Sequence, residues 1–212
     1  MFKTIINAAD LLKIIDEKST IIIDCRNSNA NVIGEKAYDI SHLPNAYYAH
    51  LEDDLSGEII KGKTGRHPFP KVADFEKNCS NWGITEDSQV IVYDWNNGGI
   101  AARLWLMLKW FGHENVALLN GGWENWQRKK LPTSSKKPSF TNSNFKAKVD
   151  ANLLVNVKEI EENIKEPKFT LIDARAAFRY RGESEPIDPI AGHIPTALSF
   201  PFTENIGTNN LF

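Results

Sequence analysis

Cysteine is scarce in this 212-residue sequence: only Cys25 and Cys79 occur, and neither belongs to a Cys-x-x-Cys pair or a cluster with histidine. This scarcity argues against a disulfide scaffold and against a structural zinc site. We therefore expect a protein of the reducing cytoplasm that needs neither a metal ion nor an organic cofactor.

The sequence also lacks a charge excess and long apolar runs. It carries 25 basic and 27 acidic residues, a net charge of -2, so no basic field favours nucleic acid or an anionic membrane. No apolar run approaches membrane-spanning length, and the first ten residues lack the apolar core of a signal peptide. We expect neither nucleic acid nor membrane among its partners.

Hydrophobic residues make up 42% of the chain and include 6 Trp and 11 Phe, which is enough for a packed core. Apolar segments of strand length alternate with amphipathic helical patterns. This alternation predicts an α/β fold in which helices cover both faces of a parallel sheet. The expected strands are 21–23, 90–93 and 116–119, and the expected helices are 8–15, 72–81, 100–111 and 123–128.

An internal repeat organises the sequence. The element IIDCR, which ends at Arg26, returns as LIDAR, which ends at Arg175. The element HLPNA, which begins at His42, returns as HIPTA, which begins at His193. Because both elements recur in the same order and at similar spacing, we expect two tandem copies of one domain.

The domain boundaries follow from this repeat. We place the first domain at residues 1–131 and a linker at residues 132–144, which are rich in Pro, Ser and Lys and have no apolar period. The second domain begins at residue 145. We expect its copy within residues 145–212 to be truncated, because it stops shortly after its HIPTA element.

A loop follows the expected strand 90–93 and leads into a helix. Backbone N–H groups at such a helix start can bind an anion, and a cysteine in the first loop position would be a reactive thiolate. Asp94 occupies that position, and we expect it to cap the helix instead. The resulting pseudo-active loop comprises Asp94, Trp95, Asn96, Asn97, Gly98 and Gly99.

Together with GRHP at 65–68, AARLW at 101–105 and GGW at 121–123, these motifs resemble the N-terminal domain of tandem thiosulfate/3-mercaptopyruvate sulfurtransferases, the rhodanese family. The second copy is similar to the start of that family's catalytic domain in FRYRGE at 178–183, EP at 185–186 and GHIPTA at 192–197. The resemblance implies two rhodanese-like domains. It also implies transfer of a sulfane sulfur from thiosulfate to a thiol or cyanide through a cysteine persulfide.

The resemblance assigns one binding residue. In the family, the arginine at the position of Arg179 contacts the anionic sulfur donor, a task that suits a guanidinium. The alternative for Arg179 is a solvated surface side chain or a salt bridge to Glu183 or Glu185. Mercaptopyruvate-type members usually carry a second arginine where this sequence has Ile187, which favours thiosulfate as the donor.

The family's catalytic cysteine lies in a Cys-Gly-Ser-Gly-type loop, which no residue here matches. We expect that cysteine to lie beyond Phe212 and the 212-residue chain to be inactive by itself. Cys25 and Cys79 are expected to be small buried side chains. The competing hypothesis is a non-catalytic rhodanese-like binding module or an inactive fragment. A rhodanese-related cysteine phosphatase is disfavoured, because this sequence has no phosphate loop that begins with Cys and ends with Arg.

Three residues of the first copy recur at equivalent positions of the second, which gives three pairs. Since they include positions in the copy that we expect to be catalytically silent, shared architecture explains them better than catalysis. We therefore predict structural roles for Asp24, Arg26, His42, Asp173, Arg175 and His193.

Overall fold

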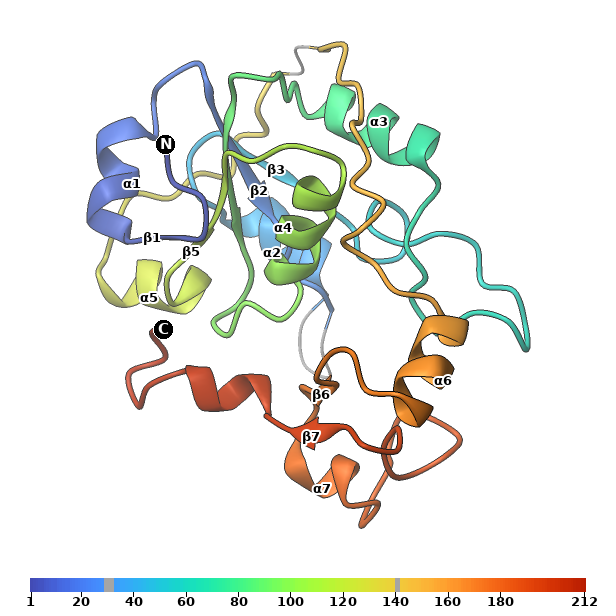
Figure 1. Ribbon diagram of the computed structural model, residues 1–212. Helices are drawn as coiled ribbons and strands as arrows, with labels where there is room; N and C mark the ends of the chain where they lie inside the picture. The colour runs from blue at the N-terminus through green and yellow to red at the C-terminus, as the bar shows by residue number, and fades with distance from the viewer. Residues whose placement is uncertain (29–32, 140–141) are drawn as a thin grey trace. The chain divides into compact units, whose positions relative to one another are not determined.

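The computed structural model describes residues 1–28, 33–139 and 142–212 of the chain. These residues form two compact units, Met1–Asp150 and Ala151–Phe212. In Figure 1 the first unit runs from blue to yellow-brown and the second is orange to red.

The first unit is built on a five-stranded sheet in which all neighbouring strands are parallel. The strand order is β1-β5-β4-β2-β3. The central strands β5, β4 and β2 are apolar and largely buried, as expected for a parallel sheet covered on both faces. The strands are β1 (Ile5–Ile6), β2 (Thr20–Asp24), β3 (Ala46–Tyr48), β4 (Gln89–Tyr93) and β5 (Val116–Leu119).

Helices cover both faces of this sheet, which confirms the predicted fold class. In β4, Val90 and Val92 pack in one core with α3 and α4, whereas Ile91 and Tyr93 pack in a second core with α1 and α5. This division follows from the alternation of side chains along a strand. The helices are α1 (Ala8–Ile14), α2 (Gly34–Ile40), α3 (Val72–Asn81), α4 (Ala101–Trp110) and α5 (Gly122–Arg128).

The second unit repeats part of the first on a smaller scale. Its strands β6 and β7 pair in parallel with Ile172 opposite Leu198, as β2 and β3 pair with Ile23 opposite Tyr47. The elements are α6 (Val157–Lys165), β6 (Ile172–Asp173), α7 (Ala177–Tyr180), β7 (Leu198–Ser199) and the 3-10 helix η1 (Phe202–Asn205).

The structure differs from the predicted domain boundaries. The predicted linker, residues 132–144, belongs to the first unit in its described part, and so do residues 145–150, which we assigned to the second domain. Residues 140 and 141 of that linker lie outside the described residues. We refer to the described residues of 132–150 as the strap.

Backbone and aromatic contacts fasten the strap to the first unit. His42 and Ser134 form an antiparallel bridge with backbone hydrogen bonds of 2.8 Å in both directions. Phe145 is 7% exposed and packs in the core that contains α3 and α4. Composition indicated a linker here, but these contacts hold the segment against the sheet and its helices.

Candidate functional site

The loop between β4 and α4 binds its own carboxylate. Asp94 is 4% exposed, and its Oδ1 accepts the backbone N–H of Gly98 at 3.0 Å. Its Oδ2 accepts the N–H groups of Ile100 at 3.0 Å and Ala101 at 3.1 Å. The amides at the start of α4 thus converge on an anion, as such loops can, and the anion is an internal side chain.

Burial raises the pKa of the Asp94 carboxyl above its usual value, while the backbone donors of Ala101, Gly98 and Ile100 oppose that rise. Gly122 leaves little room beside the loop, because a Cβ there would lie 2.6 Å from the Asp94 carbonyl oxygen. The Asp94 carboxylate therefore fills the inside of the loop, and the start of α5 packs closely against its backbone.

A buried ion pair lies beneath this loop. Arg26 is 1% exposed and donates from Nε to both carboxylate oxygens of Asp24, at 3.0 and 2.9 Å. Its Nη2 also donates to the carbonyl of Ser41 at 2.7 Å. The guanidinium carbon lies 4.2 Å from the ring centroid of Trp123. These contacts with protein groups compensate the buried charge for its lost water.

The second unit contains the same ion pair. Arg175 donates from Nε to the two oxygens of Asp173 at 3.0 and 3.1 Å, and from Nη2 to the carbonyl of Gly192 at 2.6 Å. The pairing of the predicted Asp-x-Arg residues is thus alike in both units. Unlike Arg26, the Arg175 side chain is 30% exposed.

The two predicted histidines also make equivalent contacts. His42 Nδ1 lies 2.7 Å from the carbonyl of Tyr38 and the two rings stack at 4.1 Å. His193 Nδ1 lies 2.7 Å from the carbonyl of Tyr180 and those rings stack at 3.8 Å. His42 Nε2 lies 3.2 Å from the strap carbonyl of Lys136. These contacts order the turns before β3 and β7.

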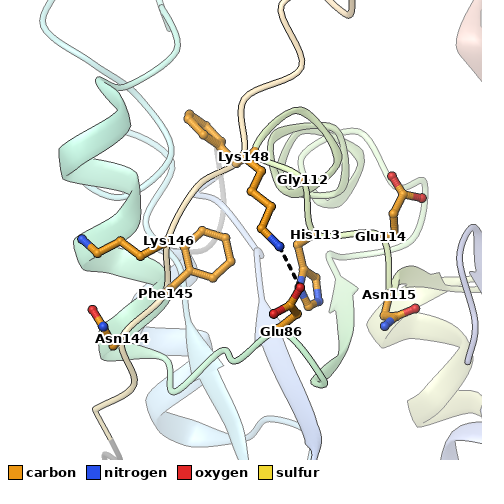
Figure 2. Close-up of a pocket in the computed structure, with 10 residues that line it drawn as sticks. Glu86, Gly112, His113, Glu114, Asn115, Asn144, Phe145, Lys146 and Lys148 are labelled. Atoms are coloured by element: carbon orange, nitrogen blue, oxygen red, sulfur yellow. Dashed lines mark hydrogen bonds and ion pairs between the residues drawn. The ribbon is translucent and has the colours of Figure 1, made fainter.

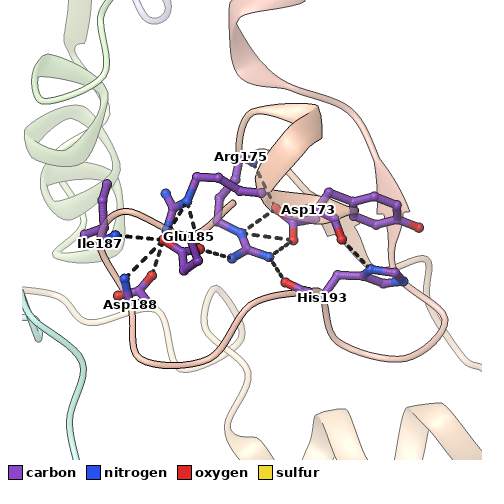
Figure 3. A network of polar contacts seen from close by, with 9 residues as sticks. Asp173, Arg175, Glu185, Ile187, Asp188 and His193 are labelled. Carbon is purple, nitrogen blue, oxygen red and sulfur yellow. Dashed lines mark hydrogen bonds and ion pairs between the residues drawn. The ribbon is translucent and has the colours of Figure 1, made fainter. Parts of the chain in front are cut away.

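Glu185 is the centre of a polar network in the second unit, which Figure 3 displays. Arg179, predicted to bind substrate, donates from Nε to both Glu185 oxygens at 3.0 and 2.9 Å. Its Nη2 donates to Asp188 at 2.7 Å. Glu185 also accepts the backbone N–H groups of Ile187 and Asp188, each at 3.0 Å.

This network has a marked electrostatic effect. The hydrogen bond from Arg179 lowers the pKa of Glu185 to about 2. Arg175 approaches Glu185 from the other side, with Nη1 3.4 Å from Oε2. The salt bridge named as the alternative role for Arg179 is therefore present. Arg181 is engaged separately and pairs with Glu183 at 2.6 Å on the surface.

Both cysteines are fully buried. Cys25 and Cys79 have 0% exposure, and burial raises the pKa of each thiol well above its usual value. A buried neutral thiol is a poor nucleophile. Among the described residues, no group of three or more His, Cys, Asp or Glu side chains is placed to hold a metal ion.

The first unit has a pocket at the amino ends of two strands of its sheet (Figure 2). Its lining includes Glu86, which precedes β4, and Asn115, which precedes β5. Lys148 of the strap spans the pocket and pairs with Glu86 at 2.7 Å. This pocket therefore lies at the amino ends of β4 and β5, whereas the Asp94 loop lies at the carboxyl end of β4. Parallel α/β sheets bind ligands at the carboxyl ends of their strands.

Sequence reasoning missed a polar cluster in residues 50–67, which follow β3. His50 Nδ1 lies 3.3 Å from Glu52 and 3.2 Å from Asp53, and His67 lies 3.7 Å from Glu52. Arg103 of α4 holds this segment by donating to the carbonyl of His67 at 2.9 Å. The GRHP motif contained the signal, but only as part of a family pattern.

Comparisons with known proteins agree with this architecture. The rhodanese-like domain family matches residues 7–129. The chain is 39% identical over 210 residues to a Pseudomonas aeruginosa protein named "Probable 3-mercaptopyruvate sulfurtransferase", covering 98% of this chain and 74% of that one. It is 32% identical over 166 residues to the Gallus gallus "Thiosulfate sulfurtransferase", covering 76% of this chain and 55% of that protein.

A solved structure is similar over the whole chain. The crystal structure of SseA from Escherichia coli, a 3-mercaptopyruvate sulfotransferase with the rhodanese fold, matches this chain with a TM-score of 0.86 at 29% identity. The match covers 100% of this chain and 79% of that one. No helix in the described part of this chain has the length and apolar character to cross a membrane.

Proposed function

The chain belongs to the rhodanese family of sulfurtransferases, and we propose that this protein moves a sulfane sulfur from thiosulfate to a thiol or cyanide acceptor. The observation that best supports a donor site is Arg179, whose guanidinium is oriented by Glu185 at 2.9 and 3.0 Å. A guanidinium held in this way offers a fork of donors to an oxyanion.

The reaction proceeds in two steps. A cysteine thiolate attacks the outer sulfur of thiosulfate, the S–S bond breaks, and sulfite leaves with the bonding electron pair. The acceptor thiolate or cyanide then attacks the cysteine persulfide and restores the thiolate. Arg179 binds the oxygens of the donor during the first step. The sulfur is carried on the protein itself, so the proposal needs no cofactor or metal ion.

The cysteine of this mechanism is neither Cys25 nor Cys79. Both are inaccessible and their pKa values are raised by burial, which opposes thiolate formation. Asp94 fills the loop before α4, whose backbone amides converge on its carboxylate. We therefore propose that the first unit is a silent domain and that the second is part of the catalytic domain, with the reactive cysteine outside these 212 residues.

Thiosulfate is the preferred donor in this proposal, and 3-mercaptopyruvate is the second candidate. Ile187 stands where mercaptopyruvate-type members carry an arginine, and its side chain cannot pair with a substrate carboxylate. The relatives bear both names, so their names do not decide between the donors. We further propose a cytoplasmic protein whose partners are small anions and thiols rather than nucleic acid or membrane.

The test is thiocyanate formation from thiosulfate and cyanide. The protein should be assayed as its cells make it, with the 212-residue chain in parallel. We expect turnover by the cellular form, a loss of at least tenfold in kcat/KM in Arg179→Ala, consistent with removal of a charge-assisted contact, and little turnover by the chain alone. Arg181→Ala is the matched control, because Arg181 pairs with Glu183 outside the network.

Two results would overturn this assignment. Turnover by the 212-residue chain that disappears in Cys25→Ser or Cys79→Ser would locate the reactive cysteine inside it. No turnover by the cellular form, with thiosulfate or with 3-mercaptopyruvate, would favour the second candidate function, a non-catalytic binding module. The internally filled Asp94 loop is the observation that supports that alternative.

A further inference from the structure

The guanidinium of Arg179 has two edges that can each hold an oxyanion through two donors, the Nε/Nη2 edge and the Nη1/Nη2 edge. Glu185 occupies the first edge: Nε lies 3.0 and 2.9 Å from its two oxygens, and Nη2 lies 2.8 Å from Oε1. An incoming anion can therefore form a two-donor contact only on the second edge.

Asp188 holds half of that second edge. Its Oδ2 accepts a hydrogen bond from Nη2 of Arg179 at 2.7 Å. Within residues 142–212 and the other described ranges, the hydrogen bonds of the Arg179 guanidinium are made by Nε and Nη2 and none by Nη1. The remaining edge thus has one donor engaged by Asp188 and one nitrogen that makes no hydrogen bond to the described residues.

The two carboxylates differ in exposure. The Glu185 side chain is 4% exposed and is fixed by Arg175, by Arg179 and by two backbone N–H groups. The Asp188 side chain is 35% exposed and its Oδ2 lies 2.7 Å from Nη2 of Arg179. Glu185 is therefore suited to orient Arg179, whereas the more exposed Asp188 side chain has solvent into which it can turn when a ligand binds.

We propose that Asp188 is a specificity-determining residue that competes with the sulfur donor for the Nη1/Nη2 edge of Arg179. The inference rests on the proposed function, in which Arg179 binds an anionic donor. An oxyanion obtains both donors of this edge when the Asp188 carboxylate turns away. Because charge repulsion grows with the charge of the ligand, Asp188 disfavours a dianion such as thiosulfate more than a monocarboxylate. Asp188 therefore acts against the preference for thiosulfate that Ile187 gives, and it weakens thiosulfate binding without supplying the carboxylate partner that 3-mercaptopyruvate would need.

The experiment compares anion binding by the wild-type chain and Asp188→Asn at constant ionic strength. Thiosulfate is the dianionic probe and acetate the monoanionic probe, with binding followed by the NMR signal of the Arg179 Nε–H group. Asn keeps the size of the side chain and removes its charge. We expect Asp188→Asn to tighten thiosulfate binding about 3- to 10-fold and acetate binding by a smaller factor.

The matched control is Glu183→Gln, which removes the same charge from the same unit. Glu183 pairs with Arg181 at 2.6 Å and not with Arg179, so we expect wild-type binding of both anions. A second comparison places Asp188→Asn in an Arg179→Lys background, with binding followed by backbone amide signals of the second unit. Lysine keeps the charge but has no fork of donors, so the gain from Asp188→Asn should disappear there.

Equal thiosulfate affinities of wild type and Asp188→Asn would overturn the inference. So would an equal gain in Glu183→Gln, a gain that persists in the Arg179→Lys background, or absence of anion binding in all variants. The proposed function is judged separately by turnover of the cellular form. Turnover together with any of these binding results removes only the role of Asp188, whereas absent turnover removes the sulfurtransferase assignment.

Discussion

The carboxylate of Asp94 accepts the backbone N–H of Ala101, the first residue of α4, at 3.1 Å. Two further amides of the same loop point at this side chain. A loop whose amides could hold a foreign anion is thereby satisfied by the chain itself. The contribution of Asp94 to the stability of the first unit can therefore be measured.

Removing the Asp94 carboxylate should therefore destabilise the first unit. We expect Asp94→Ala to lower the free energy of unfolding by about 1–3 kcal/mol, because three backbone donors lose their acceptor. Urea denaturation followed by tryptophan fluorescence measures this loss, since all six tryptophans lie in the first unit. Asp74→Ala is the control, because helix α3 has no side-chain cap bond; equal losses would contradict the prediction.

The network around Glu185 should respond to acid. Arg179 lowers the pKa of Glu185 from 4.5 to about 2, so its stabilising contribution is present above pH 4.5 and is lost as the pH falls towards 2. A carbon-13 NMR titration of the Glu185 carboxyl should give a midpoint near the lower value. In Arg179→Ala the midpoint should move up; a wild-type midpoint near 4.5 would disprove the network in solution.

Both thiols should be protected in the native protein. Cys25 and Cys79 are buried and burial raises their pKa values, so we expect slow reaction with a disulfide reagent at about pH 7.5. In denaturant, both should react quickly. Stoichiometric labelling of either thiol within the dead time of native mixing would contradict their burial and would reopen a catalytic role.

Thr196 should be a site of strain. Its φ is 71°, in the left-handed region that β-branched residues avoid. Thr196→Gly should stabilise the turn before β7 by about 1 kcal/mol. Hydrogen exchange of the Leu198 amide, which donates to Leu171 at 2.9 Å, reports on this turn.

The equivalent turn of the first unit supplies the control for this prediction. Asn45 has a φ of 62°, but asparagine tolerates that conformation better than threonine does. Asn45→Gly should therefore have a smaller effect, and a larger slowing of exchange in the Asn45 variant than in the Thr196 variant would reverse our interpretation.

The strap should behave as part of the first unit. Phe145 is 7% exposed in its core, so Phe145→Ala should cost about 3–5 kcal/mol. Phe169→Ala, at a side chain that is 40% exposed in the second unit, should cost less. Limited proteolysis should cut the wild-type chain near the boundary between residues 150 and 151, and rapid cleavage throughout residues 132–139 would support a free linker.

The alternation of apolar strand and helix patterns, together with the internal repeat, was sufficient to predict the fold class. The apolar pattern at 116–119 became β5 with the same bounds, and the helix predicted at 72–81 became α3 with the same bounds. The Asp-x-Arg repeat identified two segments that make the same contacts, because those contacts join residues close in sequence. Local chemistry of this kind is visible in a sequence.

Other features depend on distant partners or on short signals. The strap resembles a linker in composition, and only Ser134 meeting His42 and Phe145 entering the core reveal its place. Helix α6 was missed although its capping box, Asn156 and Glu159, is present in the sequence. The central role of Glu185 was missed because its partners come from both sides along the chain and meet only after the turn at 182–188 forms.

The Asp–Arg ion pair of β2 has a consequence for the order of folding. Arg26 reaches the carbonyl of Ser41, 15 residues along the chain, and Arg175 reaches Gly192 over 17 residues. In contrast, β1 pairs with β5, which is separated from it by most of the sequence of the first unit, with Ile5 opposite Leu118. Short loops close faster and at lower entropic cost. We therefore expect the β2–β3 and β6–β7 segments to be early folding nuclei and the β1 edge to join last.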